Sequence, residues 1–557
     1  MDILIKNGRV VDGTGNPWFH REIGIENGKI KEMAGEIKDK ADVTIDAGGL
    51  IVAPGFIDAH SHVDGIALFK PDMEFYVTQG VTTGAMGHCG YSPHPSKKAY
   101  VDQLYSSPWS MVWWLQTVSG SDLDWNSLTE YFDIIRKNGV AVNLAPFIGH
   151  GTMRQAVGLD MVRRDQVRKP TKEEIEAMKD LTRKGMQEGA LGLTISLGYP
   201  PNRYAETDEM VELARIVAEY DGLLAVHLRK VCGVENIKEL ADIAKKAGVK
   251  FHAAHLQIVP PYVDTLTDQL SIIDSLRSQG QEITFDVVQY PTAPLSKAAF
   301  TYAFWFISTV YDPNPPEGTD TYEKYVENLK DPAFRDAIKQ SIIKYVPDAA
   351  DYFEYIDSDL EMSPIYNTQN PEIESRTLGD VAMAQGMKAI DLFFDIVFGQ
   401  SPLVPEAANP VFGIAVMGTQ EFIEKATAHP VATPSMDLAP PELPPEMTPW
   451  PNSYGFMAKY FRDAVERGVT VEEAVRKMTS LPAQNFRLFD RGLLREGMAA
   501  DIVIFDPMSF KNISNIYNPY AKAVGMRYVI VNGKVALEEG KQTEERAGQI
   551  LLKKKAA

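Results

Sequence analysis

The stretch that decides the fold is Pro54-Gly55-Phe56-Ile57-Asp58-Ala59-His60-Ser61-His62. The apolar run Leu50-Ile51-Val52-Ala53 leads into it, and together they predict a buried strand that ends in two histidines. Side chains alternate between the faces of a strand, so His60 and His62 point the same way. Two imidazoles on one face can bind one metal ion at about 2.0–2.1 Å each. The stretch therefore predicts a metal site at a strand end.

The composition is that of a globular protein with ample material for a core. Of the 557 residues, 45% are hydrophobic and 24% are charged. The formal net charge of -19 argues against nucleic acid as a partner, because an acidic surface repels phosphates. No apolar run is long enough for a bilayer and the first residues do not resemble a signal peptide, so we expect no membrane partner. Only two cysteines, Cys89 and Cys232, are present, which favours the reducing cytoplasm.

Both ends of the chain have sequence patterns that predict short strands. Asn7-Gly8 and Asn27-Gly28 each follow a short apolar run, and Asn-Gly is a strong signal for a hairpin turn. Residues 500–506 alternate between apolar and polar like a strand. Neither end is long enough to build a good core alone. We therefore predict one small β-sandwich, formed by residues 1–53 together with residues 481–557.

Residues 54–480 alternate between apolar, strand-like runs and segments with helical periodicity. Residues 191–195 follow the helical segment 171–188, and residues 223–227 follow the helical segment 206–220. Repeated βα units over this length predict a parallel α/β barrel. Functional residues of such barrels lie at the carboxyl ends of the strands.

Two stretches interrupt this alternation. Residues 101–125 contain four tryptophans, and residues 294–375 are long, aromatic and acidic. Insertions after barrel strands often cover an active site, so we predict that residues 294–375 form a lid that shapes the substrate pocket. The alternative is a peripheral subdomain that supports contact with a second copy, and a homo-oligomer is compatible with the sequence.

Further side chains capable of metal binding or acid–base chemistry follow the predicted strands: Cys89, His150, His227, His255 and Asp437. Thiolate and imidazole ligands favour zinc over magnesium or calcium, and together with His60 and His62 these side chains can supply one or two metal sites. A catalytic metal also needs a nearby carboxylate that takes and returns protons, and Asp437 suits that role. Each residue taken singly is more often structural, so their shared placement at strand ends carries the prediction. Other histidines are assigned structural or exposed positions: His20, His88, His94 and His252.

These residues and their order resemble the amidohydrolase superfamily, and more narrowly the N-acyl-D-amino-acid deacylase (D-aminoacylase) family. Beyond the first motif at 54–62, the matching segments are 87–92, 148–154, 189–201, 226–229, 254–256, 477–483 and 491–503. They run in the family's order along nearly the whole chain. Only the segments near 101–125 and 294–375 lie outside the resemblance.

The resemblance implies a (β/α)8 TIM-like barrel with a β-sandwich from both termini. It implies one zinc held tightly by Cys89, His227 and His255, and a second, weaker metal position formed by His60, His62 and Asp437. On this resemblance Asp437 is the general base and acid, and zinc polarises the scissile carbonyl and activates water. Three further positions match pocket residues of the family: His150, Tyr199 and Tyr290.

Departures from the family pattern bear on the substrate. Asn452 stands where the family places an arginine that grips the substrate carboxylate, and asparagine cannot make that charge-assisted, bidentate contact. Gln257 replaces a lysine that is common after the preceding histidine. Arg229 remains a candidate anion partner, with a structural salt bridge as its alternative.

The sequence therefore predicts a zinc-dependent amidohydrolase that cleaves a C–N amide bond in a small molecule. An N-acyl amine or amino-acid derivative without a free carboxylate fits best. A cyclic amidase, or a hydrolase of another carbonyl compound on the same metal site, is the alternative enzyme. A non-catalytic binding protein of this fold would have lost metal ligands, and the six expected ligands are present.

Overall fold

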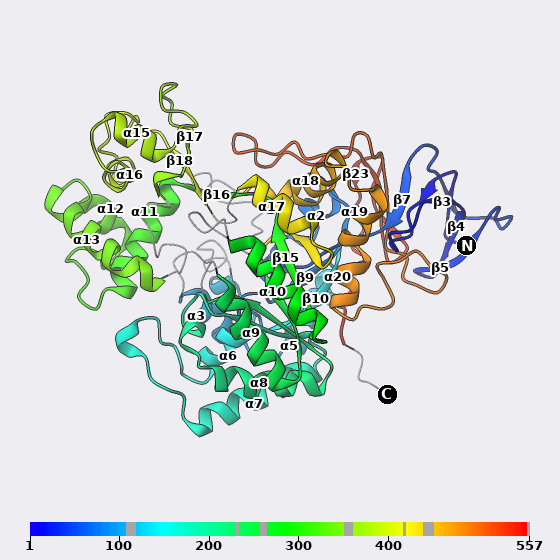
Figure 1. Cartoon of the computed structure of the whole chain (residues 1–557), viewed down its shortest axis with the longest axis horizontal. Coiled ribbons are helices and arrows are strands. Elements are labelled where there is room, and N and C mark those ends of the chain that lie inside the picture. Colours follow the sequence, from blue (N-terminus) through cyan, green and yellow to red (C-terminus); the bar gives the residue numbers. More distant parts are fainter. Residues whose placement is uncertain are drawn as a thin grey trace.

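The computed structural model describes residues 1–106, 118–229, 233–256, 265–349, 360–415, 419–437 and 450–553. A parallel barrel lies in the middle of the molecule, with a β unit at one end and a helical insert at the other (Figure 1). Much of the tryptophan-rich stretch, together with Cys232 and Gln257, lies outside the described residues.

The barrel has eight strand positions in the described chain, all parallel. They are β8 (Phe56–Asp58), β9 (Val81–Met86), β10 (Asn143–Pro146) with β11 (Ile148–Gly149), β12 (Gly192–Ser196), β13 (Leu223–His227), β14 (Lys250–Ala254), β15 (Ile283–Val288) and β19 (Ala432–Ser435). β10 and β11 are halves of one strand, interrupted at Phe147. The ring closes where the Asp437 amide donates to the His60 carbonyl at 2.9 Å, which confirms the predicted barrel.

Helices link and cover these strands. Before the insert they are α1 (Asp64–Phe69), α2 (Glu74–Val77), α3 (Lys97–Leu104), α5 (Leu128–Asn138), α6 (His150–Ala156), α7 (Lys172–Gln187), α8 (Thr207–Glu219), α9 (Val234–Ala247) and α10 (Leu266–Ser278). After it come α17 (Gln420–Ala428), α18 (Asn452–Glu466), α19 (Val471–Met478) and α20 (Ser480–Asn485). α7 begins at a capping box in which Thr171 and Glu174 satisfy each other's backbone amides. The predicted βα alternation is thus present.

The two chain ends form one β unit. The amino-terminal strands are β1 (Ile3–Lys6), β2 (Arg9–Val10), β3 (Phe19–His20), β4 (Glu22–Glu26), β5 (Lys29–Ala34), β6 (Val43–Asp46) and β7 (Ile51–Pro54). The carboxyl-terminal strands are β20 (Ile502–Phe505), β21 (Met526–Val531), β22 (Lys534–Glu538) and β23 (Lys541–Gln542). β7 pairs with β20, so strands from opposite ends share one sheet, and isoleucines and valines from both ends pack into one core. This confirms the predicted sandwich built from both termini.

The insert between β15 and β19 has a hydrophobic core of its own. Its elements are β16 (Thr292–Ser296), α11 (Lys297–Phe306), η4 (Ile307–Tyr311), α12 (Tyr322–Asn328), α13 (Pro332–Ala349), β17 (Ile365–Tyr366), α15 (Leu378–Ala384), α16 (Ala389–Val397) and β18 (Val411–Ala415). The insert runs from Thr292 to Ala415 and is longer than the expected segment 294–375. The chain leaves the barrel through β16 and returns through β18, and these two strands pair with each other. Its helices stand apart from the barrel in Figure 1.

We searched the described residues for a membrane span. None of their helices has both the length and the apolar character needed to cross a bilayer.

Candidate active site

The predicted ligands meet in one buried cluster at the carboxyl ends of the barrel strands. Donor atoms of His60, Cys89, His255 and Asp437 all lie within 4.8 Å of one another. The Cys89 sulfur lies 3.3 Å from His60 Nε2, 3.5 Å from His255 Nε2 and 3.8 Å from His227 Nδ1. The cluster therefore comes from the last residue of β13 and from the segments that directly follow β8, β9, β14 and β19.

A second group of contacts overlaps the first. Asp437 Oδ1 lies 3.4 Å from His60 Nε2 and 3.5 Å from His62 Nε2. His62 is 7% exposed and Asp437 is also 7% exposed, so this side of the cluster is the one that reaches toward solvent. The two groups of contacts share His60, which lies against both Cys89 and Asp437, so the six residues form one continuous cluster.

The sulfur–nitrogen distances of the cluster are close to those around a zinc ion. A tetrahedral ion with Zn–S and Zn–N bonds of about 2.3 and 2.0 Å separates sulfur from nitrogen by roughly 3.5 Å. The three sulfur–nitrogen distances bracket that value. His227 Nδ1 and His255 Nε2 are closer, at 2.8 Å. A buried set of one sulfur, imidazole nitrogens and a carboxylate is also the chemistry that zinc prefers.

Three of the six predicted ligands have an unusual backbone conformation. Cys89, His255 and Asp437 have left-handed φ angles of +51°, +33° and +64°. A non-glycine residue pays roughly 1–3 kcal/mol for such a conformation, which persists where the surrounding structure holds it, typically at functional sites. Gly87 shows how the Cys89 loop is packed, since a Cβ there would meet the Phe147 carbonyl at 2.3 Å. Glycine is thus required two residues before the cysteine.

Neighbouring charges set the ionisation of the cluster. Burial would raise the pKa of Cys89, but the charges of His60 and His255 and the contact with His227 lower the pKa well below its ordinary value. Burial likewise opposes ionisation of Asp437, and the hydrogen bond with His62 and the charges of His255 and His60 lower its pKa. Both groups are therefore held as anions, the form in which they bind metal.

Two buried aspartates, Asp58 and Asp286, support this cluster, and the sequence analysis assigned neither of them to the site. Asp58 accepts from the amides of His60 and Met436 at 3.2 and 3.1 Å and from the Tyr76 hydroxyl at 2.6 Å. Asp286 reaches His60, His255 and two further side chains. The sequence signal that could have identified these two residues is an acid within a mostly apolar strand, because a buried carboxylate needs hydrogen-bond partners.

The predicted pocket residues lie in different surroundings. The Tyr199 ring lies 4.7 Å from the His227 ring and packs against both the barrel core and the insert core. His150 is buried, and its Nε2 lies 2.8 Å from Glu209, which also pairs with Arg154. The Tyr290 hydroxyl bonds with Asn512 and lies 3.5 Å from Ser514 Oγ, so it is joined to the carboxyl-terminal segment. Burial raises the pKa of Tyr290 to about 12.

Arg229 and Asn452 are both engaged within the protein. Arg229 donates to Glu239 at 3.0–3.2 Å and to the carbonyls of Arg203 and Ala205 at 2.7 and 3.3 Å. The buried Asn452 donates its amide hydrogen to the Met436 carbonyl, next to Asp437. Of the two alternatives for Arg229, the structure therefore favours the structural salt bridge over a cation that is free to bind a substrate anion.

The chain is similar to known proteins over nearly its whole length. The amidohydrolase family matches residues 43–537, and the chain belongs to that family. It is 28% identical to D-aminoacylase from Alcaligenes xylosoxydans xylosoxydans, over 99% of this chain and 98% of that protein. It is 26% identical to N-acyl-D-glutamate deacylase from the same organism, over 99% and 96%.

Solved structures show the same architecture. N-acyl-D-glutamate deacylase from Bordetella bronchiseptica, complexed with zinc and a phosphonate inhibitor that mimics the tetrahedral intermediate, matches with a TM-score of 0.71. That match has 25% identity and covers 99% of both chains. A crystal structure of D-aminoacylase matches with the same TM-score at 24% identity. The predicted resemblance to the D-aminoacylase branch is confirmed.

Proposed function

We propose that this chain is a zinc-dependent hydrolase that cleaves the amide C–N bond of a small N-acyl compound. Membership of the amidohydrolase family and full-length similarity to deacylases make hydrolysis of a C–N bond the reaction class. The observation that carries the proposal is the buried cluster of one cysteine, histidines and one aspartate at the barrel's carboxyl end.

In this proposal Cys89, His227 and His255 hold the tight zinc, and His60, His62 and Asp437 can hold a second, weaker one. A bound zinc supplies polarisation of a carbonyl and acidification of water. The Asp437 carboxylate takes a proton from the attacking water and returns it to the departing amine, so one amide and one water become one acid and one amine. The left-handed backbone of Asp437 and the hydrogen bond from its amide to the His60 carbonyl fix the position of that carboxylate.

We infer further that the preferred substrate lacks a free carboxylate beside the scissile amide. The two residues nominated to grip such a group are engaged elsewhere, Arg229 with Glu239 and two carbonyls, and Asn452 with the Met436 carbonyl. A guanidinium whose nitrogens are already bonded gains little from a substrate carboxylate, because it must first give up those bonds.

The insert acts in this proposal as the cover of the pocket. Tyr199 supports that role, since its ring touches His227 and packs against both hydrophobic cores. A second link joins the Tyr311 hydroxyl of the insert to the Ser106 carbonyl at 2.5 Å.

The test is turnover on a matched panel, with zinc content measured on the same sample. The panel holds N-acetyl-D-amino acids, their L-isomers, and the corresponding amides and esters that lack the carboxylate. We expect the carboxylate-free compounds to be hydrolysed fastest by zinc-loaded protein. Preference for the D-acids would contradict the substrate assignment, and zinc without turnover on any member would favour cyclic amides or other carbonyl substrates.

A further inference from the structure

Asp286 is a fully buried carboxylate that touches three neighbouring strands at the level of the cluster. Its Oδ1 accepts from the His255 amide at 2.9 Å and lies 3.5 Å from His60 Nδ1. Its Oδ2 accepts from the Ser435 hydroxyl at 2.5 Å. Its own carbonyl accepts from the Leu256 amide at 2.8 Å. Asp286 therefore fixes two consecutive amides at the place where the chain turns left-handed after β14.

Thr284, His252 and Asp286 form a short hydrogen-bonded column, in which Thr284 contacts His252 and His252 contacts Asp286. His252 Nε2 lies 2.8 Å from Asp286 Oδ1, and His252 Nδ1 lies 2.7 Å from the Thr284 hydroxyl. A carboxylate only accepts hydrogen bonds, so in the neutral imidazole Nε2 carries the proton and Nδ1 accepts from Thr284. The pairing of β14 with β15 sets His252 beside Thr284, so the register of the sheet builds this column.

We infer that Asp286 is a positioning residue of the metal centre. It faces Nδ1 of the His60 ring, it holds the left-handed turn that presents His255, and it is itself oriented by His252 and Thr284. Carboxylates that orient metal-binding histidines commonly contribute about 10–100-fold to metal affinity. This role rests on the proposed function, because it requires that the cluster bind a metal.

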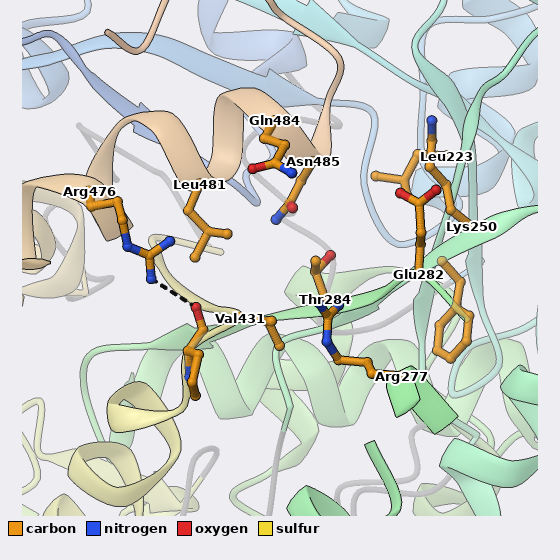
Figure 2. Close-up of a pocket in the computed structure, with 12 residues that line it drawn as sticks. Leu223, Lys250, Arg277, Glu282, Thr284, Val431, Arg476, Leu481, Gln484 and Asn485 are labelled. Atoms are coloured by element: carbon orange, nitrogen blue, oxygen red, sulfur yellow. Dashed lines mark hydrogen bonds between the residues drawn. The ribbon is translucent and has the colours of Figure 1, made fainter. Parts of the chain in front are cut away.

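The far end of the column opens on a cavity of about 430 Å³ at the amino ends of the barrel strands (Figure 2). Thr284 lines this cavity together with Leu223 and Lys250, which belong to β13 and β14. The cavity therefore lies at the opposite end of the barrel from the cluster. Thr284 can be changed there without altering a residue that touches the proposed ligands.

The experiment measures zinc affinity by competition with a chelator, together with the absorption spectrum of the Co²⁺-substituted protein. We expect Asp286→Ala to weaken zinc binding about 10–100-fold and to change the Co²⁺ spectrum. Asp286→Asn, which keeps an acceptor oxygen but loses the charge, should give a smaller loss. His252→Phe and Thr284→Val should weaken binding in the same direction, and Thr284→Ser should restore it.

Asp501→Ala is the matched control. Asp501 is also buried, accepts from Arg491, Asn143 and Asn532, and lies beside the start of β10 at the barrel's amino end. It should lower stability and leave zinc affinity unchanged. A folded Asp286→Asn or His252→Phe protein with wild-type zinc affinity and an unchanged Co²⁺ spectrum would overturn the positioning role alone. Wild-type protein that binds no zinc would overturn the proposed function as well.

Discussion

Truncating Phe393 in the insert should loosen that subdomain and leave the barrel intact. Phe393 is 1% exposed, and its ring lies 4.9 Å from both Phe300 and Phe412 in edge-to-face geometry. Removing a buried phenylalanine side chain costs about 3–5 kcal/mol, and each aromatic pair adds about 0.5–1.5 kcal/mol beyond the buried area. We therefore expect the free-energy cost of Phe393→Ala to lie at the upper end of about 3–5 kcal/mol.

That loss is large beside the roughly 5–15 kcal/mol that stabilises a typical domain. Because the insert core is separate from the barrel core, the cost should be confined to residues 292–415. Amide hydrogen exchange should accelerate there by orders of magnitude while β12 to β15 stay protected and zinc content is unchanged. Turnover should fall, since Tyr199 loses part of its support.

Phe393→Leu is the control, because a side chain closer in volume should cost less than about 1.5 kcal/mol. Equal loss of protection in the barrel strands, or loss of zinc, would refute the view that the two cores are independent. Faster exchange in the insert with unchanged turnover would refute its role as a cover.

Three further substitutions test the site. Asp437→Asn should keep the fold and the tight zinc yet lower turnover by about 10²–10⁴-fold, and near-wild-type turnover would remove the general-base role. Cys89→Ala should lower the zinc found per chain by metal analysis, and unchanged zinc would mean that the thiol only packs. Arg229→Met should change kcat/KM for a carboxylate substrate and for its amide by the same factor. A loss confined to the carboxylate substrate, of roughly tenfold to 150-fold for a charged hydrogen bond worth about 1.5–3 kcal/mol, would contradict its structural role.

Local patterns were enough to predict the barrel and the cluster. The run before His60 and His62 has strand periodicity, and the Asn-Gly turns at both ends are short-range signals. Because the carboxyl ends of parallel strands share one rim, residues far apart in sequence could be assigned to one site. Cys89, His227, His255 and Asp437 were predicted in this way.

Features that depend on register between strands could not be predicted. Asp286 lies beside His252 because Thr284 pairs with that histidine, and a shift of one residue would turn the carboxylate outward. The end of the insert depends on the pairing of Thr292 with Ala415, more than a hundred residues away in sequence. The engagement of Arg229 with Glu239 and two loop carbonyls likewise required the three-dimensional structure.

The central claim is that amide hydrolysis depends on a metal held by the buried cluster. The most direct measurement is turnover of an N-acetylated substrate during stepwise return of zinc to chelator-treated protein, with bound zinc determined at each step. The account predicts little turnover without zinc and a rise in proportion to bound zinc up to one equivalent per chain. Full turnover in the metal-free protein, or a full equivalent of tightly bound zinc without any gain in turnover across the substrate panel, would contradict it.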